Sequence, residues 1–68
     1  MRHEVSIFHS TDEELEAVVY YDSNTDQYEI DFIENGKIVA TESYIDHNLH
    51  YHEDAAENYV LGIKKLAS

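Results

Sequence analysis

The stretch that decides the fold is residues 28–42, which read YEIDFIENGKIVATE. Apolar and acidic side chains alternate along its first half, as they do in a half-buried β-strand. Asn35-Gly36 in the middle is a strong hairpin signal, because both residues tolerate the positive φ that a type I′ turn requires. We therefore predict two antiparallel strands, residues 28–33 and 38–45, joined by a two-residue turn.

A two-residue turn also fixes which residues lie opposite each other. The predicted cross-strand pairs are Ile33 with Ile38, Phe32 with Val39, Ile30 with Thr41 and Glu29 with Glu42. The core face of the hairpin would then carry Tyr28, Ile30, Phe32, Val39, Thr41 and Ile45. The opposite face would be rich in carboxylates.

The rest of the chain adds two strands before the hairpin and one helix after it. Residues 4–9 alternate in polarity, and residues 15–21 are β-branched and aromatic, so both segments favour strands. Residues 53–66 have the apolar spacing of an amphipathic helix, with Gly62 inside it and Lys64 and Lys65 in its last turn. The sequence thus predicts one α+β domain over residues 1–68. Its four-stranded antiparallel sheet (β-β-β-β-α) is covered on one face by a C-terminal helix.

The charge of the chain limits its partners. There are 15 acidic residues against four Lys or Arg, a formal net charge of −11, and no Lys or Arg lies between Arg2 and Lys37. Such a field excludes nucleic acid and anionic membranes as simple partners and favours basic proteins or cations. The pattern predicts a non-enzymatic protein-binding domain.

Several other classes are disfavoured by what the sequence lacks. It has no cysteine and therefore no disulfide, thiolate metal site or Cys nucleophile. No glycine-rich phosphate loop, nucleophile elbow or distinct acid/base pair is present, so we expect neither catalysis nor a cofactor. The absence of a long apolar run leads us to expect a cytoplasmic protein.

The uncovered face of the predicted sheet is the main candidate for partner binding. Its residues would be Glu16, Val18, Tyr20, Glu29, Asp31, Ile33, Ile38 and Glu42. Apolar side chains on such a face favour a homodimer or another protein partner. The carboxylates also allow a second hypothesis, a DNA mimic that inhibits a nucleic-acid-binding protein, and a plain solvated face remains open beside both.

A second candidate is the histidine-rich segment 46–54, DHNLHYHED. His47, His50 and His52 with the neighbouring carboxylates could hold zinc or serve as a pH-responsive loop. Their spacing matches no closed metal site, so we favour a polar connection that leads into the helix.

The run Ala55-Ala56-Glu57-Asn58-Tyr59-Val60-Leu61-Gly62-Ile63-Lys64, which follows an acidic β-rich segment, resembles small uncharacterised proteins of marine tailed bacteriophages. The resemblance covers the last quarter of the chain. It implies an accessory protein in the cytoplasm of a bacterial host and carries no activity or site residue with it.

Overall fold

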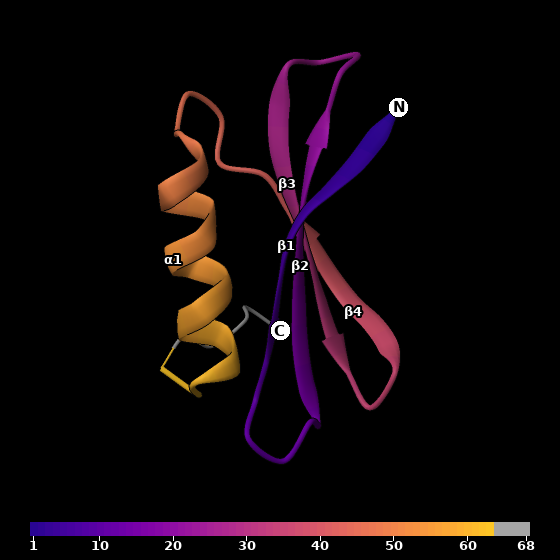
Figure 1. Cartoon of the computed structure of the whole chain (residues 1–68), viewed down its shortest axis with the longest axis vertical. Coiled ribbons are helices and arrows are strands. Elements are labelled where there is room, and N and C mark those ends of the chain that lie inside the picture. The colour runs from indigo at the N-terminus through magenta and orange to yellow at the C-terminus, as the bar shows by residue number, and fades with distance from the viewer. Residues whose placement is uncertain (64–68) are drawn as a thin grey trace.

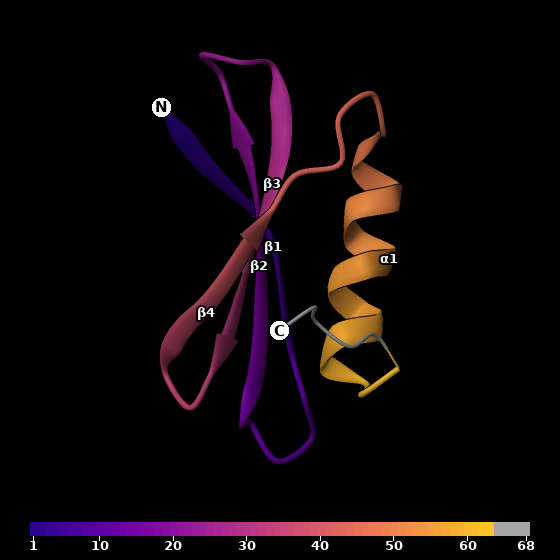
Figure 2. The same ribbon diagram turned by 180° about the vertical axis from the view of Figure 1, so that it is seen from behind.

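The computed structural model describes residues 1–63 and has the predicted α+β architecture. Its elements are β1 (Arg2–His9), β2 (Leu15–Asp22), β3 (Gln27–Glu34), β4 (Lys37–Glu42) and α1 (Leu49–Val60). The strands form one antiparallel sheet in the order β1-β2-β3-β4, so each strand pairs with its neighbour in sequence. Figures 1 and 2 show that α1 lies along one side of this sheet and that the segment after β4 leads to it.

The β3–β4 turn follows the sequence prediction. Asn35 has φ 51° and Gly36 has φ 81°, the left-handed conformations of a type I′ turn. The first pairs after the turn are Glu34 with Lys37 and Ile33 with Ile38. The prediction for Ile33 and Ile38 is therefore confirmed.

Beyond this point the predicted register is wrong, because β4 contains a bulge. Phe32 lies opposite Ala40 rather than Val39, and Ile30 lies opposite Glu42 rather than Thr41. Val39 is the extra residue that the bulge inserts. Side chains alternate between the two faces of a strand, so one inserted residue places every later side chain on the face opposite to the predicted one. Ala40 and Glu42 therefore point toward the helix, and Thr41 points away from it. The strand also ends at Glu42, which leaves Ile45 in the connection and 69% exposed.

The β1–β2 pair has a similar irregularity. Its register shifts between Glu4 and Ser6, so that Val5 has no direct partner on β2. β1 and β4 are the two edge strands of the sheet, and each contains one bulge. Bulges at free edges hinder pairing with the edge of another sheet.

Helix α1 begins and ends earlier than predicted. Asn48 is its N-cap, and the side-chain oxygen of Asn48 accepts a hydrogen bond from the Tyr51 N–H. At the other end Gly62 does not lie inside the helix but follows the C-cap with φ 80°. The Gly62 N–H donates to the Tyr59 carbonyl and the Ile63 N–H to the Asn58 carbonyl, which is a Schellman motif. The predicted positions of Lys64 and Lys65 lie outside the described residues.

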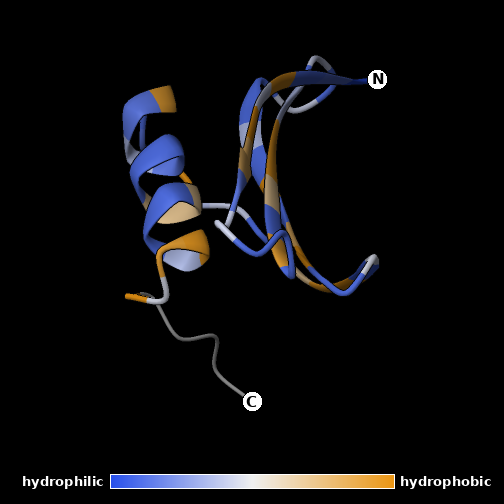
Figure 3. Ribbon diagram, turned by 60° about the horizontal axis from the view of Figure 1, so that its bottom comes forward, coloured by the Kyte–Doolittle hydropathy of each residue, from blue (hydrophilic) through white to orange (hydrophobic). Residues whose placement is uncertain are grey.

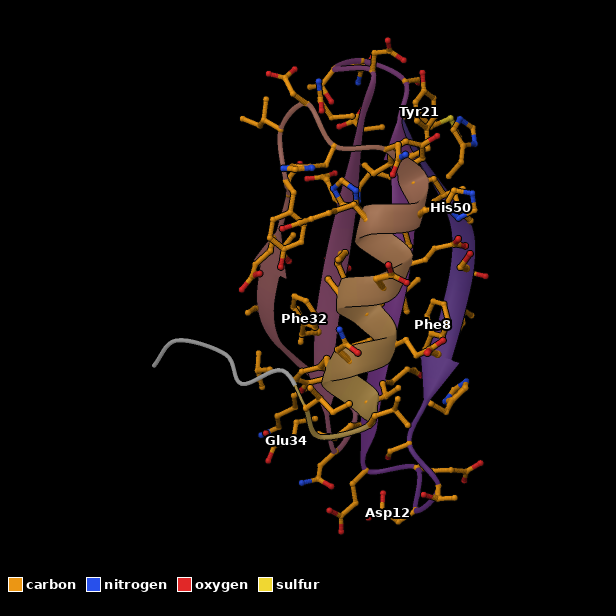
Figure 4. The ribbon with its side chains drawn as sticks, turned by 90° about the vertical axis from the view of Figure 1, so that its left-hand side faces the viewer. Phe8, Asp12, Tyr21, Phe32, Glu34 and His50 are labelled. Carbon is orange, nitrogen blue, oxygen red and sulfur yellow. The ribbon has the colours of Figure 1, made fainter. Side chains whose placement is uncertain are left out.

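The hydrophobic core lies between α1 and the central strands. It consists of Ala17 and Val19 of β2, Ile30 and Phe32 of β3, and Ala56, Tyr59 and Val60 of α1. In Figure 4 the labelled Phe8 and Phe32 flank the helix on the sheet beneath it, with Phe32 on the β4 side. The prediction that Ile30 and Phe32 are buried under the helix is confirmed. Tyr59 and Val60 of the helix pack against them, whereas Ile63, also expected on the buried side of the helix, is 69% exposed. No helix within residues 1–63 has the length and apolar character needed to cross a membrane.

Candidate interaction surface on the open sheet face

Helix α1 covers only one face of the sheet, and Figure 3 shows no element against the other. We call this uncovered side the open face. Each strand contributes one aliphatic side chain to it, and we call these four residues the apolar strip: Ile7, Val18, Ile33 and Ile38. Ile7 lies directly opposite Val18, and Ile33 lies directly opposite Ile38. Ile38 is 62% exposed and Ile7 is 43% exposed, whereas Val18 is only 5% exposed, so the apolar area in contact with water is largest on the two edge strands.

Beside the apolar strip, Arg2 binds residues of β2 and β3 from the edge strand β1. Its guanidinium carbon lies 3.9 Å from the centre of the Tyr20 ring. Arg2 Nη2 donates to Asp31 Oδ1 at 3.0 Å, and Arg2 Nε lies 3.3 Å from Glu29 Oε1. We call this group, Arg2 with Tyr20, Glu29 and Asp31, the Arg2 clasp. It ties the N-terminal strand to the third strand across the open face.

The electrostatics of the Arg2 clasp centre on Asp31, whose residue is only 3% exposed. A buried carboxylate is costly unless it is paired and hydrogen-bonded. Here Asp31 Oδ1 accepts hydrogen bonds from Arg2 and from the Thr41 hydroxyl at 2.8 Å. Partial burial lowers the pKa of the Arg2 guanidinium, but the hydrogen bond to Asp31 and the charges of Asp31 and Glu29 outweigh it and raise the pKa overall. Arg2 therefore remains a cation that compensates the buried charge.

The structure places most of the predicted partner-binding residues on the open face. These are Glu16, Val18, Tyr20, Glu29, Asp31, Ile33 and Ile38. Glu42 is the exception: the β4 bulge turns it toward the helix side, where its carboxylate accepts a hydrogen bond from the Tyr44 hydroxyl. The predicted cross-strand pair of Glu29 with Glu42 is wrong, because Glu42 lies opposite Ile30.

Sequence reasoning missed three members of this surface, Arg2, Ile7 and Thr41. The one available signal was Arg2 itself, which is the only arginine of the chain and stands at the start of a strand in an otherwise acidic half. The position of Thr41 depends on the β4 bulge, which the sequence pattern does not reveal.

The three candidate histidine ligands do not converge on one point. The His47 ring stacks on Tyr51 with ring centres 3.9 Å apart, and His50 Nδ1 lies 3.6 Å from a carboxylate oxygen of Glu53. Among residues 1–63, no group of three or more His, Cys, Asp or Glu side chains is arranged to hold a metal ion.

His52 has a structural role that the sequence did not indicate. It is fully buried, its Nε2 accepts a hydrogen bond from the Tyr44 N–H, and its Nδ1 lies 2.9 Å from the Asn48 carbonyl. Since Nε2 is the acceptor, Nδ1 carries the proton, and the ring is neutral. Both nitrogens are thus used to hold the connection after β4 against the helix.

Carboxylates at the strand ends also have local partners. Asp12 in the β1–β2 turn accepts from the Ser10 hydroxyl and the Glu14 N–H, and these two bonds lower its pKa below the usual 3.8. Asp22 accepts from the Asn24 N–H, and this bond lowers its pKa as well. These acids therefore stabilise turns.

The chain matches no family model, and neither the curated proteins nor the solved structures contain a significant match. The resemblance of the C-terminal run to phage proteins stays a prediction. A functional interpretation must therefore come from the surface itself.

Proposed function

We propose that this protein is a small, non-enzymatic binding domain that associates with a second copy of itself through the open face. The observation that carries the proposal is the apolar strip, in which Ile7, Val18, Ile33 and Ile38 lie on the face of the sheet that no other element of residues 1–63 covers. Exposed apolar side chains on an uncovered sheet face, here Ile7 and Ile38 above all, mark an interaction surface more often than a surface meant only for water.

The size of the open face fits a weak to standard homodimer. Four strands spaced about 4.8 Å apart, each about eight residues long, give a face of roughly 19 by 26 Å, or about 500 Å². A specific interface buries at least ~1,200 Å² in total, about 600 Å² per chain, and the accessible area of a corrugated face exceeds its flat projection. The chain exposes 4594 Å² in all, so the dimer would cover about an eighth of it.

The two edge strands favour association through the open face over association through the edges of the sheet. β1 and β4 both carry bulges, at Val5 and Val39, which hinder association by strand addition. Face-to-face packing around a two-fold axis needs no free edge, and it would place one apolar strip against the other.

A DNA mimic is the alternative that we keep in second place. Mimicry requires carboxylates that remain free and exposed at the spacing of phosphates. On the open face the Arg2 clasp engages Glu29 and Asp31, and Asp31 is buried. This arrangement favours burial of the face against a protein over its use as a phosphate surrogate.

The experiment that tests the proposal compares Ile38→Lys with Ile45→Lys by sedimentation equilibrium. Both residues are isoleucines with similar exposure, 62% and 69%, but only Ile38 belongs to the apolar strip. Each substitution makes the net charge less negative, which by itself reduces repulsion between two chains. We expect Ile38→Lys to weaken self-association about tenfold or more, equivalent to ~1.4 kcal/mol, and Ile45→Lys to leave it unchanged or slightly stronger. Equal effects of the two variants would contradict the proposal.

A further inference from the structure

A groove of about 370 Å³ lies on the helix side of the molecule, away from the open face. It is lined by Tyr44, Tyr51, Asp54, Ala55, Asn58 and Ile63. Four of these residues form one face of helix α1 at spacings of three, four and seven: Tyr51, Asp54, Ala55 and Asn58. Tyr44, from the connection after β4, lies against Tyr51 at nearly a right angle, with ring centres 5.1 Å apart.

The lining combines aromatic rings with one carboxylate. Asp54 and Tyr51 are exposed, and the structure records no ion pair of Asp54 with any residue in the range 1–63. The surrounding sequence is negative on balance, since residues 38–65 contain five Asp or Glu against Lys64 and Lys65. An anionic ligand would be repelled there, and a cation would be attracted.

The same molecule shows how such a combination holds a cation. On the open face the Arg2 guanidinium lies over a tyrosine ring and against carboxylates. Tyr51 and Asp54 provide the same two chemical groups one helical turn apart, with no Lys or Arg of residues 1–63 between them. His47 stacks on one face of the Tyr51 ring but does not line the groove, so a cation in the groove would meet the rest of the ring.

We infer that this groove is a binding site for a cationic side chain, with arginine preferred, on a basic peptide segment of a partner protein. A tyrosine ring and a carboxylate together suit the planar guanidinium group. Its flat face stacks on aromatic rings, and the N–H groups at its edge donate hydrogen bonds to oxygen atoms. The Ala55 methyl group offers apolar surface to the methylene stem, and Asn58 offers an amide oxygen. The volume is at the lower end of the range for small-ligand sites, enough for one long side chain. The site is independent of the dimer proposed above, because the open face is on the other side of the sheet.

The test is an NMR titration of the full chain with the capped tripeptide acetyl-Gly-Arg-Gly-amide, against the same peptide with neutral citrulline in place of arginine. We expect saturable shifts centred on Tyr51, Asp54 and Asn58, with a Kd on the order of a millimolar, because a single side chain buries little area. The citrulline peptide should bind at least about threefold more weakly, and added salt should weaken the arginine peptide.

Matched variants distinguish binding in the groove from unspecific attraction to the negative charge of the chain. Asp54→Asn should weaken arginine binding about three- to fivefold, whereas Glu57→Gln, the same loss of charge on the same helix outside the groove, should have little effect. Tyr51→Leu should weaken binding and Tyr51→Phe should preserve it, because only the ring is required. The inference is overturned if Glu57→Gln acts as strongly as Asp54→Asn, if citrulline binds as well as arginine, or if the shifts spread over all acidic turns without saturating.

Discussion

The ring of Phe32 lies 4.7 Å from the ring of Tyr59, tilted by 59°, and this contact joins the middle of the sheet to the last turn of the helix. Phe32 is fully buried and Tyr59 is 5% exposed. In a core of only seven buried side chains within the described residues, one aromatic pair contributes a large share of the apolar packing.

We therefore expect Phe32→Ala to destabilise the domain by about 3–5 kcal/mol, through lost burial and the cavity that remains. A domain of this size has little stability in reserve, so the variant should be largely unfolded at room temperature. Thermal and urea denaturation followed by circular dichroism measure this effect. Ile45→Ala, at an exposed aliphatic position, is the control and should change the midpoint little. An unchanged transition for Phe32→Ala would mean that the core is elsewhere.

The Arg2 clasp gives a second prediction. Arg2→Gln removes the main charged partner of the buried Asp31, and we expect a loss of about 1–3 kcal/mol in the free energy of unfolding. The double variant Arg2→Met with Asp31→Leu removes both charges and should recover much of that loss. Urea denaturation of Arg2→Met, of Asp31→Leu and of the double variant that combines them forms a complete double-mutant cycle. Strict additivity of the two single changes would show that Arg2 and Asp31 do not interact.

The depressed pKa of Asp12 predicts a pH effect at the β1–β2 turn. Hydrogen bonds from the Ser10 hydroxyl and the Glu14 N–H favour the ionised carboxylate, so its pKa is below 3.8 in the folded state. A depressed carboxyl pKa adds stability that is fully present above the unfolded pKa and is lost as the pH falls through the folded value. NMR titration of the Asp12 carboxyl carbon should give a midpoint below 3.8, and Ser10→Ala should move it upward. A midpoint at or above 3.8 in the parent would contradict the turn geometry.

The end of the helix gives a fourth prediction. Gly62 has φ 80°, and a Cβ at this position would meet no atom within 4 Å, so the cost of a substitution comes from the backbone alone. Gly62→Ala should cost about 1–2 kcal/mol, because L-residues other than Asn and Asp disfavour this conformation. Gly62→Asn should cost clearly less. Equal midpoints for the two variants in thermal denaturation would argue against the Schellman end.

Much of the fold could be predicted from local chemistry. Asn35-Gly36 determines the turn, alternation determines the strands, and the spacing of Ala56, Tyr59 and Val60 determines the face that the helix buries. These signals act between close neighbours in sequence and need no knowledge of the rest of the chain.

The remaining features depend on tertiary context. The bulges at Val5 and Val39 use residues that fit an ordinary strand equally well, so the register error after Val39 could not be seen in the pattern. The helix begins at Leu49, before His50 and His52, rather than at Glu53 after them, because burial of His52 with both nitrogens bonded compensates for its polarity. On the open face, the prediction identified most residues but not the arginine that crosses it.

The most direct test of the account is sedimentation of the parent protein at low and high salt over a range of concentrations. Two chains with a net charge of −11 repel each other, and added salt screens this repulsion, so association through the apolar strip should strengthen with salt. We predict a monomer–dimer equilibrium that shifts toward dimer as the ionic strength rises. A protein that stays monomeric at every salt and protein concentration would contradict self-association through the open face.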